Sequence, residues 1–167
     1  MDRTFLAVSA ATVVLLAGGV AAGVFLTDTG VFDDQPRVDA AVTGFSGGNA
    51  TCVDEPATEP RVTVGENTTR GAFLILRANV TVGSPDTRIE NATLRETGLA
   101  NYTLTYETTG GGGACPSGET AVAYTQTVFQ LPQRSDAPFG VTVLRGDETL
   151  FRLRNGPNGL RVANASA

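Results

Sequence analysis

The chain has 167 residues with 12 basic and 17 acidic side chains, so its formal net charge at neutral pH is −5. Such a balance argues against nucleic acid as a partner, because binding phosphates requires a basic patch. Gly and Thr are abundant while Trp and His are absent, a composition typical of strands and turns rather than helices.

The N-terminal segment is uncharged over residues 4–26. As a helix its 23 residues would span about 34 Å, enough to cross a hydrocarbon core. Arg3 precedes the segment and Asp28 follows it, so the positive-inside rule predicts that the rest of the chain lies outside a membrane. Two interpretations of residues 1–27 stay open: an uncleaved signal anchor, or a signal peptide that is cleaved near residues 20–22.

An acidic juxtamembrane linker is predicted over residues 28–37, which contain Asp28, Asp33 and Asp34. These carboxylates lack the alternating spacing and the glycine of a calcium-binding EF-hand loop. The better interpretation is a solvated spacer, and no metal site is expected.

Residues 38–154 alternate short apolar stretches with turn residues about every ten positions, the pattern of an all-β sandwich or barrel. No segment in this part carries a sustained helical period. Residues 155–167 begin with Asn-Gly-Pro-Asn-Gly and are predicted to be a turn and a C-terminal tail. The expected strands are residues 38–45, 61–65, 72–82, 88–95, 102–108, 121–131, 141–145 and 149–154.

Six of the eight asparagines lie in the N-glycosylation pattern Asn-x-Ser/Thr, whereas the Ser and Thr content alone predicts roughly 1.4 such sites. The excess indicates a chain that meets an oligosaccharyltransferase outside a membrane, in agreement with the predicted orientation. The predicted glycosylation sites are Asn49, Asn67, Asn79, Asn91, Asn101 and Asn164.

Strand alternation extends this prediction to the two faces of each strand, because successive side chains point to opposite sides. A glycosylated Asn101 must face water, which turns Tyr102, Leu104 and Tyr106 inward. Asn79 likewise faces outward. Phe73 and Ile75 interrupt the outward face of that strand, so another part of the chain is expected to cover them.

Cys52 and Cys115 are the only two cysteines, and outside the cell they are expected to form a disulfide between two turn-rich loops. Their spacing resembles that of the inter-sheet cysteines in immunoglobulin domains, although the chain has no Trp. The resemblance implies a two-sheet antiparallel, immunoglobulin-like sandwich, preceded here by one N-terminal transmembrane or signal helix.

The chain carries no recognisable catalytic constellation. The absence of histidine excludes a Ser-His-Asp triad and a Cys-His pair. Two cysteines without histidine cannot supply the four ligands of a structural zinc site. The glycine run at residues 110–113 has no lysine nearby, so it does not match a phosphate-binding loop. We therefore predict no enzyme, no cofactor and no metal.

The C-terminal hairpin supplies the candidate interface. Gly146-Asp147 suits a two-residue turn, which would place Arg145 opposite Glu148 and Val143 opposite Leu150. Arginine is enriched at interfaces. The candidate interface residues are Arg145, Arg152 and Arg154. The alternative interpretation is an exposed strand edge with solvated arginines.

Lysine is absent, and every basic residue is an arginine. In this composition and in its layout the whole chain resembles small signal-anchored surface proteins of halophilic archaea, without a shared motif. The resemblance and the patterns above predict a membrane-anchored, glycosylated extracellular domain with a structural or interaction role and a protein partner at the cell envelope. The alternative is a ligand- or substrate-binding accessory domain of a membrane complex. The partner and the oligomeric state stay open.

Overall fold

The computed structural model describes residues 39–56, 59–67 and 71–164. The predicted anchor or signal segment and the acidic linker lie outside these residues, as do residues 165–167 at the end of the predicted tail. Within the described ranges, no helix is long and apolar enough to cross a membrane.

The described residues form nine strands and no helix. Eight of them match the strands predicted from the sequence, with shifted ends, and the ninth lies in the predicted tail. The strands are β1 (Ala41–Val53), β2 (Arg61–Asn67), β3 (Gly71–Thr81), β4 (Arg88–Gly98), β5 (Asn101–Thr109), β6 (Thr120–Leu131), β7 (Phe139–Arg145), β8 (Glu148–Gly156) and β9 (Gly159–Asn164).

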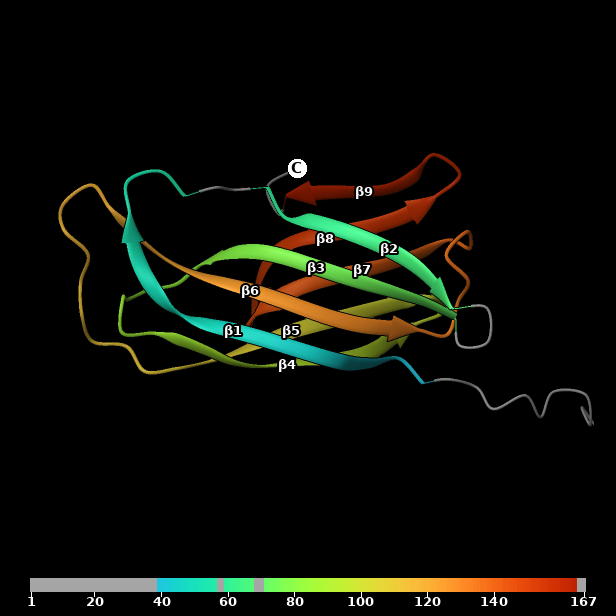
Figure 1. Ribbon diagram of the computed structural model, residues 1–167, viewed down its shortest axis with the longest axis horizontal. Coiled ribbons are helices and arrows are strands. Elements are labelled where there is room, and N and C mark those ends of the chain that lie inside the picture. Colours follow the sequence, from blue (N-terminus) through green and yellow to red (C-terminus); the bar gives the residue numbers. More distant parts are fainter. Residues whose placement is uncertain (1–38, 57–58, 68–70, 165–167) are drawn as a thin grey trace, which may run out of the picture. The chain divides into compact units, whose positions relative to one another are not determined.

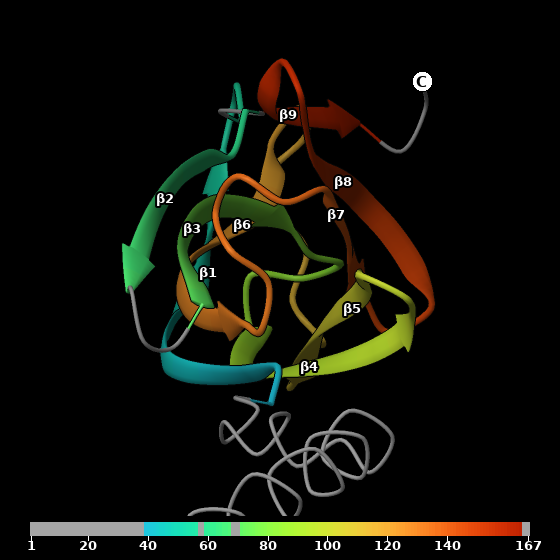
Figure 2. The same cartoon turned by 90° about the vertical axis from the view of Figure 1, so that its right-hand side faces the viewer.

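The strands follow one another in the order β2-β3-β6-β1-β4-β5-β7-β8-β9. They form two groups that face each other like the layers of a sandwich, β2-β3-β6-β1 and β4-β5-β7-β8-β9 (Figures 1 and 2). The two groups meet between β1 and β4, where the register contains the single pair Asn49 and Arg88. All pairs are antiparallel except β5 with β7, so the antiparallel prediction holds for most of the fold.

The core lies between the two groups and confirms the predicted alternation. Tyr102, Leu104 and Tyr106 are at most 1% exposed, whereas Asn101 and Glu107 on the same strand are exposed. Buried and more exposed side chains alternate in the same way along β3. The largest fully buried side chains are Tyr102, Tyr106, Phe129, Leu74, Leu76, Ile89, Leu104, Leu131, Leu153, Val80, Val141 and Val143.

The cover expected over Phe73 and Ile75 comes from neighbouring strands on the same face. Phe73 lies directly across from Gly65 of β2, and a Cβ added to Gly65 would overlap the Phe73 ring. The missing side chain therefore leaves room for the ring to lie across the edge strand. Ile75 pairs with Val128 of β6, and all three apolar side chains are half-buried.

The prediction that Cys52 lies in a loop is wrong, because β1 continues to Val53. Gly47-Gly48-Asn49 resembles a turn in sequence, but the register shifts there while β1 stays paired with β6. Cys52 then pairs with Ala121. A β-bulge absorbs the extra residue and lets one strand continue through glycines that would otherwise mark its end.

The hairpin between β7 and β8 confirms the predicted pair of Arg145 with Glu148, but the next predicted pair is wrong. Val143 lies opposite Phe151 rather than Leu150, because the register shifts after Val143. The bulge turns Phe151 into the core, where it is 5% exposed. The larger apolar side chain thus takes the buried position.

The predicted C-terminal tail is also wrong, because residues 159–164 form β9 along β8. Gly156 pairs with Gly159 at the turn. The sequence signal is weak since β9 is an edge strand whose Arg161, Val162 and Ala163 are all exposed. Without a buried face, the strand shows no alternation that a pattern analysis would detect.

Candidate functional site

The sequon asparagines lie on the outer surfaces of both groups of strands. Asn49 and Asn79 lie on β1 and β3, and Asn91 and Asn101 lie on β4 and β5; all four are exposed. Asn67 and Asn164 are the last residues of β2 and β9, and their side chains lie outside the described part. Each described asparagine therefore presents its side chain to solvent, as attachment of a glycan requires.

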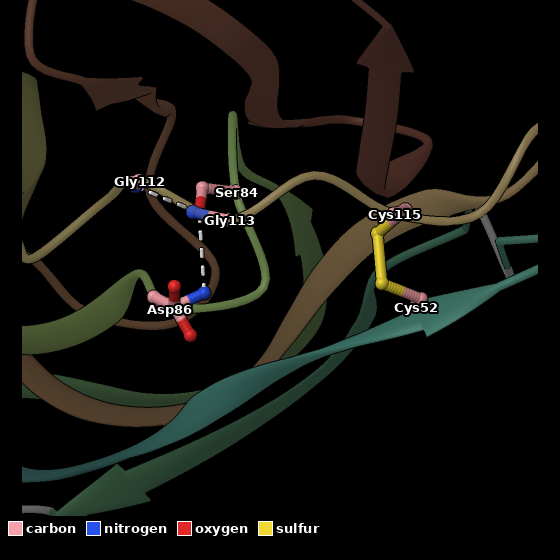
Figure 3. Close-up of a disulfide and its surroundings, with 6 residues drawn as sticks. All are labelled: Cys52, Ser84, Asp86, Gly112, Gly113 and Cys115. Atoms are coloured by element: carbon pink, nitrogen blue, oxygen red, sulfur yellow. Dashed lines mark hydrogen bonds between the residues drawn. A yellow bond between two sulfur atoms is a disulfide. The ribbon is translucent and has the colours of Figure 1, made fainter.

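A disulfide joins Cys52 at the end of β1 to Cys115 in the loop between β5 and β6 (Figure 3). The Cα atoms are 5.6 Å apart and the two residues are separated by 63 positions. The predicted bond is thus confirmed. Disulfides form and persist chiefly in oxidising compartments.

The glycine run at residues 110–113 is held against the loop between β3 and β4. The Ser84 hydroxyl oxygen accepts hydrogen bonds from the backbone N–H groups of Gly112 and Gly113 at 3.1 Å each, and of Asp86 at 3.2 Å (Figure 3). A Cβ on Gly113 would lie 2.7 Å from an Asp86 carboxylate oxygen. The glycines therefore permit a close loop contact, and Ser84 already occupies N–H groups that a phosphate would need.

Two buried tyrosines carry the shifted pKa values of the described residues. Burial raises the pKa of Tyr106, and hydrogen bonds with Thr125 and Thr127 partly oppose the shift. Burial likewise raises the pKa of Tyr102, whose hydroxyl donates to Gln133 at 2.6 Å. Among the described residues, no buried side-chain N or O atom lacks a partner. With pKa values raised above the ordinary tyrosine value, both hydroxyls are neutral at physiological pH and hydrogen-bonded to neighbouring side chains.

Three arginines form an exposed cationic patch on β8 and β9, which we call the arginine surface: Arg152, Arg154 and Arg161. Arg154 lies directly across from Arg161 in the ladder, and all three side chains are exposed. Within the described part of the chain, none of the three forms an ion pair. Like charges placed opposite each other in a sheet are destabilising, so this arrangement has a local cost.

Arg145 lies apart from the arginine surface, although the sequence places it in the same candidate interface. Its guanidinium donates to the Glu148 carboxylate and to the Thr81 carbonyl of β3, so it connects the hairpin to the other group of strands. The side chain is 23% exposed. Arg161 was not predicted as an interface residue because the strand β9 was not predicted. The glycine-bounded turn before β9 is the sequence signal that could have indicated this strand.

No cluster of metal-ligating side chains occurs among the residues that the structure describes. Comparison of the chain with protein-family models, curated proteins and solved structures finds no match. The functional argument therefore rests on the chain's own residues.

Proposed function

We propose that this protein is a membrane-anchored, N-glycosylated extracellular domain with a structural or interaction role at the cell surface. The observation that carries the proposal is the exposure of Asn49, Asn79, Asn91 and Asn101 on four strands of a disulfide-bonded domain. Sugars at these positions would project from both outer surfaces and leave the core undisturbed. The description as immunoglobulin-like is part of the proposal and refers to the two-layer architecture alone.

Residues 4–26 supply the membrane contact in this proposal, as an uncleaved anchor or as a signal peptide that is removed. Their apolar length fits a bilayer and their flanking charges direct the following chain outward. The absence of lysine and the acidic balance fit the resemblance to surface proteins of halophilic archaea. Both properties concern solubility and location rather than a particular reaction.

The arginine surface is the proposed contact with an acidic partner at the cell envelope. Unpaired guanidinium groups attract carboxylates and can form bidentate hydrogen bonds with them. Strands β7 and β8 carry no sequon, so no glycan is attached to the strand of Arg152 and Arg154. The sequon residues Asn101, which lines a hollow with Arg154, and Asn164, at the end of β9, would place glycans at the border of the arginine surface. The arginines repel one another in the free domain, and an anionic partner would relieve this repulsion.

Mass spectrometry of the native protein tests the location. We expect it in the membrane fraction or the medium, with Cys52 and Cys115 oxidised and sugar on several of the six sequons. The N-terminus of the mature chain would decide between anchor and cleaved signal. A cytosolic protein with reduced thiols and bare asparagines would contradict the proposal.

Binding to soluble polyglutamate tests the arginine surface. The double variant Arg152→Glu/Arg154→Glu should lose at least tenfold in affinity, and binding by the native protein should weaken as salt rises. The matched control is Arg61→Glu/Arg77→Glu, which makes the same charge change at a cross-strand pair on the other group of strands. Equal losses in both variants would show that net charge alone governs binding.

A further inference from the structure

The outer face of β3 and β6 presents an aromatic ring beside a sequon asparagine. Tyr124 is 51% exposed, in contrast to Tyr102 and Tyr106 at 1% each. Tyr124 lies directly across from Asn79 in the antiparallel ladder, so both side chains share one face. Directly opposed residues have Cβ atoms about 4.5–5.5 Å apart. The ring is therefore within reach of any group attached to the Asn79 amide.

Two shallow hollows adjoin this pair of residues, and Asn79 and Tyr124 line both of them. The first has a volume of about 530 Å³ and is also lined by Glu59, Arg61 and Arg77. The second has about 400 Å³ and is bounded by side chains from β1 and the loop that follows it. Tyr124 thus stands between two hollows whose other walls offer charged and hydroxyl groups.

We propose that Tyr124 is the platform on which the first sugars of an N-glycan at Asn79 pack, an inference that rests on the proposed glycosylation. A pyranose ring has one face made of C–H groups and a rim of hydroxyls. The C–H face removes apolar surface from water when it packs on an aromatic ring. The hydroxyl rim can meet carboxylate and guanidinium groups such as those of Glu59 and Arg77.

The covalent link makes such a weak contact effective. A sugar attached to Asn79 is already held next to the ring, so packing costs little translational freedom and its effective concentration is high. The same contact with a free sugar would pay that cost in full. The hollows are open at the surface, which suits a glycan that continues into solvent rather than a small enclosed ligand.

The other described sequon asparagines lack an aromatic in register. Asn101 lies opposite Gly98 of β4 and Gly140 of β7, and Asn91 lies opposite Glu107. Asn49 pairs with Arg88, but from the bulge in β1 it also lines the second hollow together with Asn79 and Tyr124. Asn79 is distinguished by its place directly opposite Tyr124 in the ladder. Asn101 lies on the other group of strands, where it lines a hollow with Leu99 and the buried Phe139, so it provides a control for a glycan remote from Tyr124.

A thermal double-mutant cycle on the glycosylated protein tests the inference. Thr81→Ala removes the sequon and keeps Asn79, and Tyr124→Ala removes the ring. Tyr124→Ala should lower the Tm by roughly 2–4 °C more in the protein with an Asn79 glycan than in the Thr81→Ala background. Tyr124→Phe should retain most of the effect because the ring stays. In the control background Thr103→Ala, which removes the Asn101 sequon, the Tyr124→Ala effect should be unchanged.

Equal effects of Tyr124→Ala with and without the Asn79 glycan would overturn the inference. Mass spectrometry separates its failure from that of the proposed function: a bare Asn79 beside occupied sequons would overturn the inference alone, and bare asparagines throughout would overturn both. A third arm adds free oligosaccharide of the same composition to the Thr81→Ala protein. Binding that Tyr124→Ala abolishes, together with equal Tm effects of Tyr124→Ala with and without the Asn79 glycan, would assign the platform to sugars of another molecule and contradict a role for the protein's own glycan.

Discussion

The two ends of the sandwich are held together by different means. At the end where β1, β5 and β7 finish, which we call the disulfide end, the loops are joined by Cys52–Cys115 and by the Ser84 hydroxyl. At the opposite end, where β1 begins (Figure 1), the described loops are joined by hydrogen bonds, among them those from the Ala72 N–H to the Gln133 carbonyl and from the Gly140 N–H to the Ala100 carbonyl. Asn155 donates to the carbonyls of Ser135 and Ala137 at 2.8 Å each.

The difference follows from the loops themselves. The connection between β5 and β6 spans residues 110–119 and begins with a glycine run, so it has high conformational entropy in the unfolded chain. The turn between β4 and β5 consists of Leu99 and Ala100 alone, and hydrogen bonds from Asn101 and Gly140 to its two carbonyls hold it without a covalent link. The glycine-rich loop between β5 and β6 is thus cross-linked by a disulfide, whereas this tight turn is held by hydrogen bonds alone.

Removing the disulfide should have the largest effect. The double variant Cys52→Ser/Cys115→Ser should lose about 4 kcal/mol of unfolding free energy, because the bond closes a loop of 63 residues. Chemical denaturation of the oxidised native protein and of the variant measures the difference. Reduction of the native protein should reproduce it. A loss below about 1 kcal/mol would show that the hydrogen bonds of the disulfide end hold the loops without the covalent link.

Ser84→Ala should come next. The Ser84 side chain is 6% exposed, and its loss leaves the N–H groups of Asp86, Gly112 and Gly113 without their acceptor, at a cost of about 2–3 kcal/mol. Amide hydrogen exchange should accelerate at the two glycines. The control is Ser117→Ala, an exposed serine in the same loop, which should change little. Unchanged exchange at the glycines would contradict the assigned role.

At the opposite end, Asn155→Ala should cost less, about 1–2 kcal/mol, because two hydrogen bonds to partly exposed loop carbonyls are lost. Faster exchange should be confined to the loop between β6 and β7. Asn158→Ala, at an exposed position of the neighbouring turn, is the control. If the exchange also rises near Cys115, the two ends are coupled and the comparison fails.

The sequence predicted the parts of the fold that depend on a buried face. The alternation around Tyr102 and Tyr106, the outward sequon asparagines and the pairing of the two cysteines all follow from residues whose environment is strongly one-sided. Strand order is a different matter: the parallel pairing of β5 with β7 joins strands whose partners are chosen by the whole core rather than by either strand's pattern.

The candidate site was predicted less well, for an equally physical reason. Arg152 and Arg154 stand out on an alternating strand, but Arg161 lies on β9, whose central residues are all exposed. Arg145 shares their residue type and not their environment, because it reaches the Thr81 carbonyl. The role proposed for Tyr124 was not predicted for a similar reason. It depends on the residue opposite it on β3, which the sequence of β6 alone does not identify.

The smallest expected effect comes from substituting two turn residues that have the same backbone φ, one at each end of the sandwich. Ala100 is the only described non-glycine residue with positive φ, at 55°, and Gly146 in the turn between β7 and β8 has the same φ. A side chain is disfavoured at such an angle, while glycine also has more unfolded-state entropy to lose. Ala100→Gly should therefore stabilise the protein by less than about 1 kcal/mol.

The reverse substitution, Gly146→Ala, should destabilise by a similar amount. A Cβ at Gly146 would meet no atom within 4 Å, so the cost is conformational and contains no clash. Denaturation midpoints of both variants against the native protein measure the pair. If both substitutions change the unfolding free energy in the same direction, the surroundings of each turn set the change rather than its backbone angle. Opposite changes would show that turn geometry acts independently of the cross-linking that distinguishes the two ends.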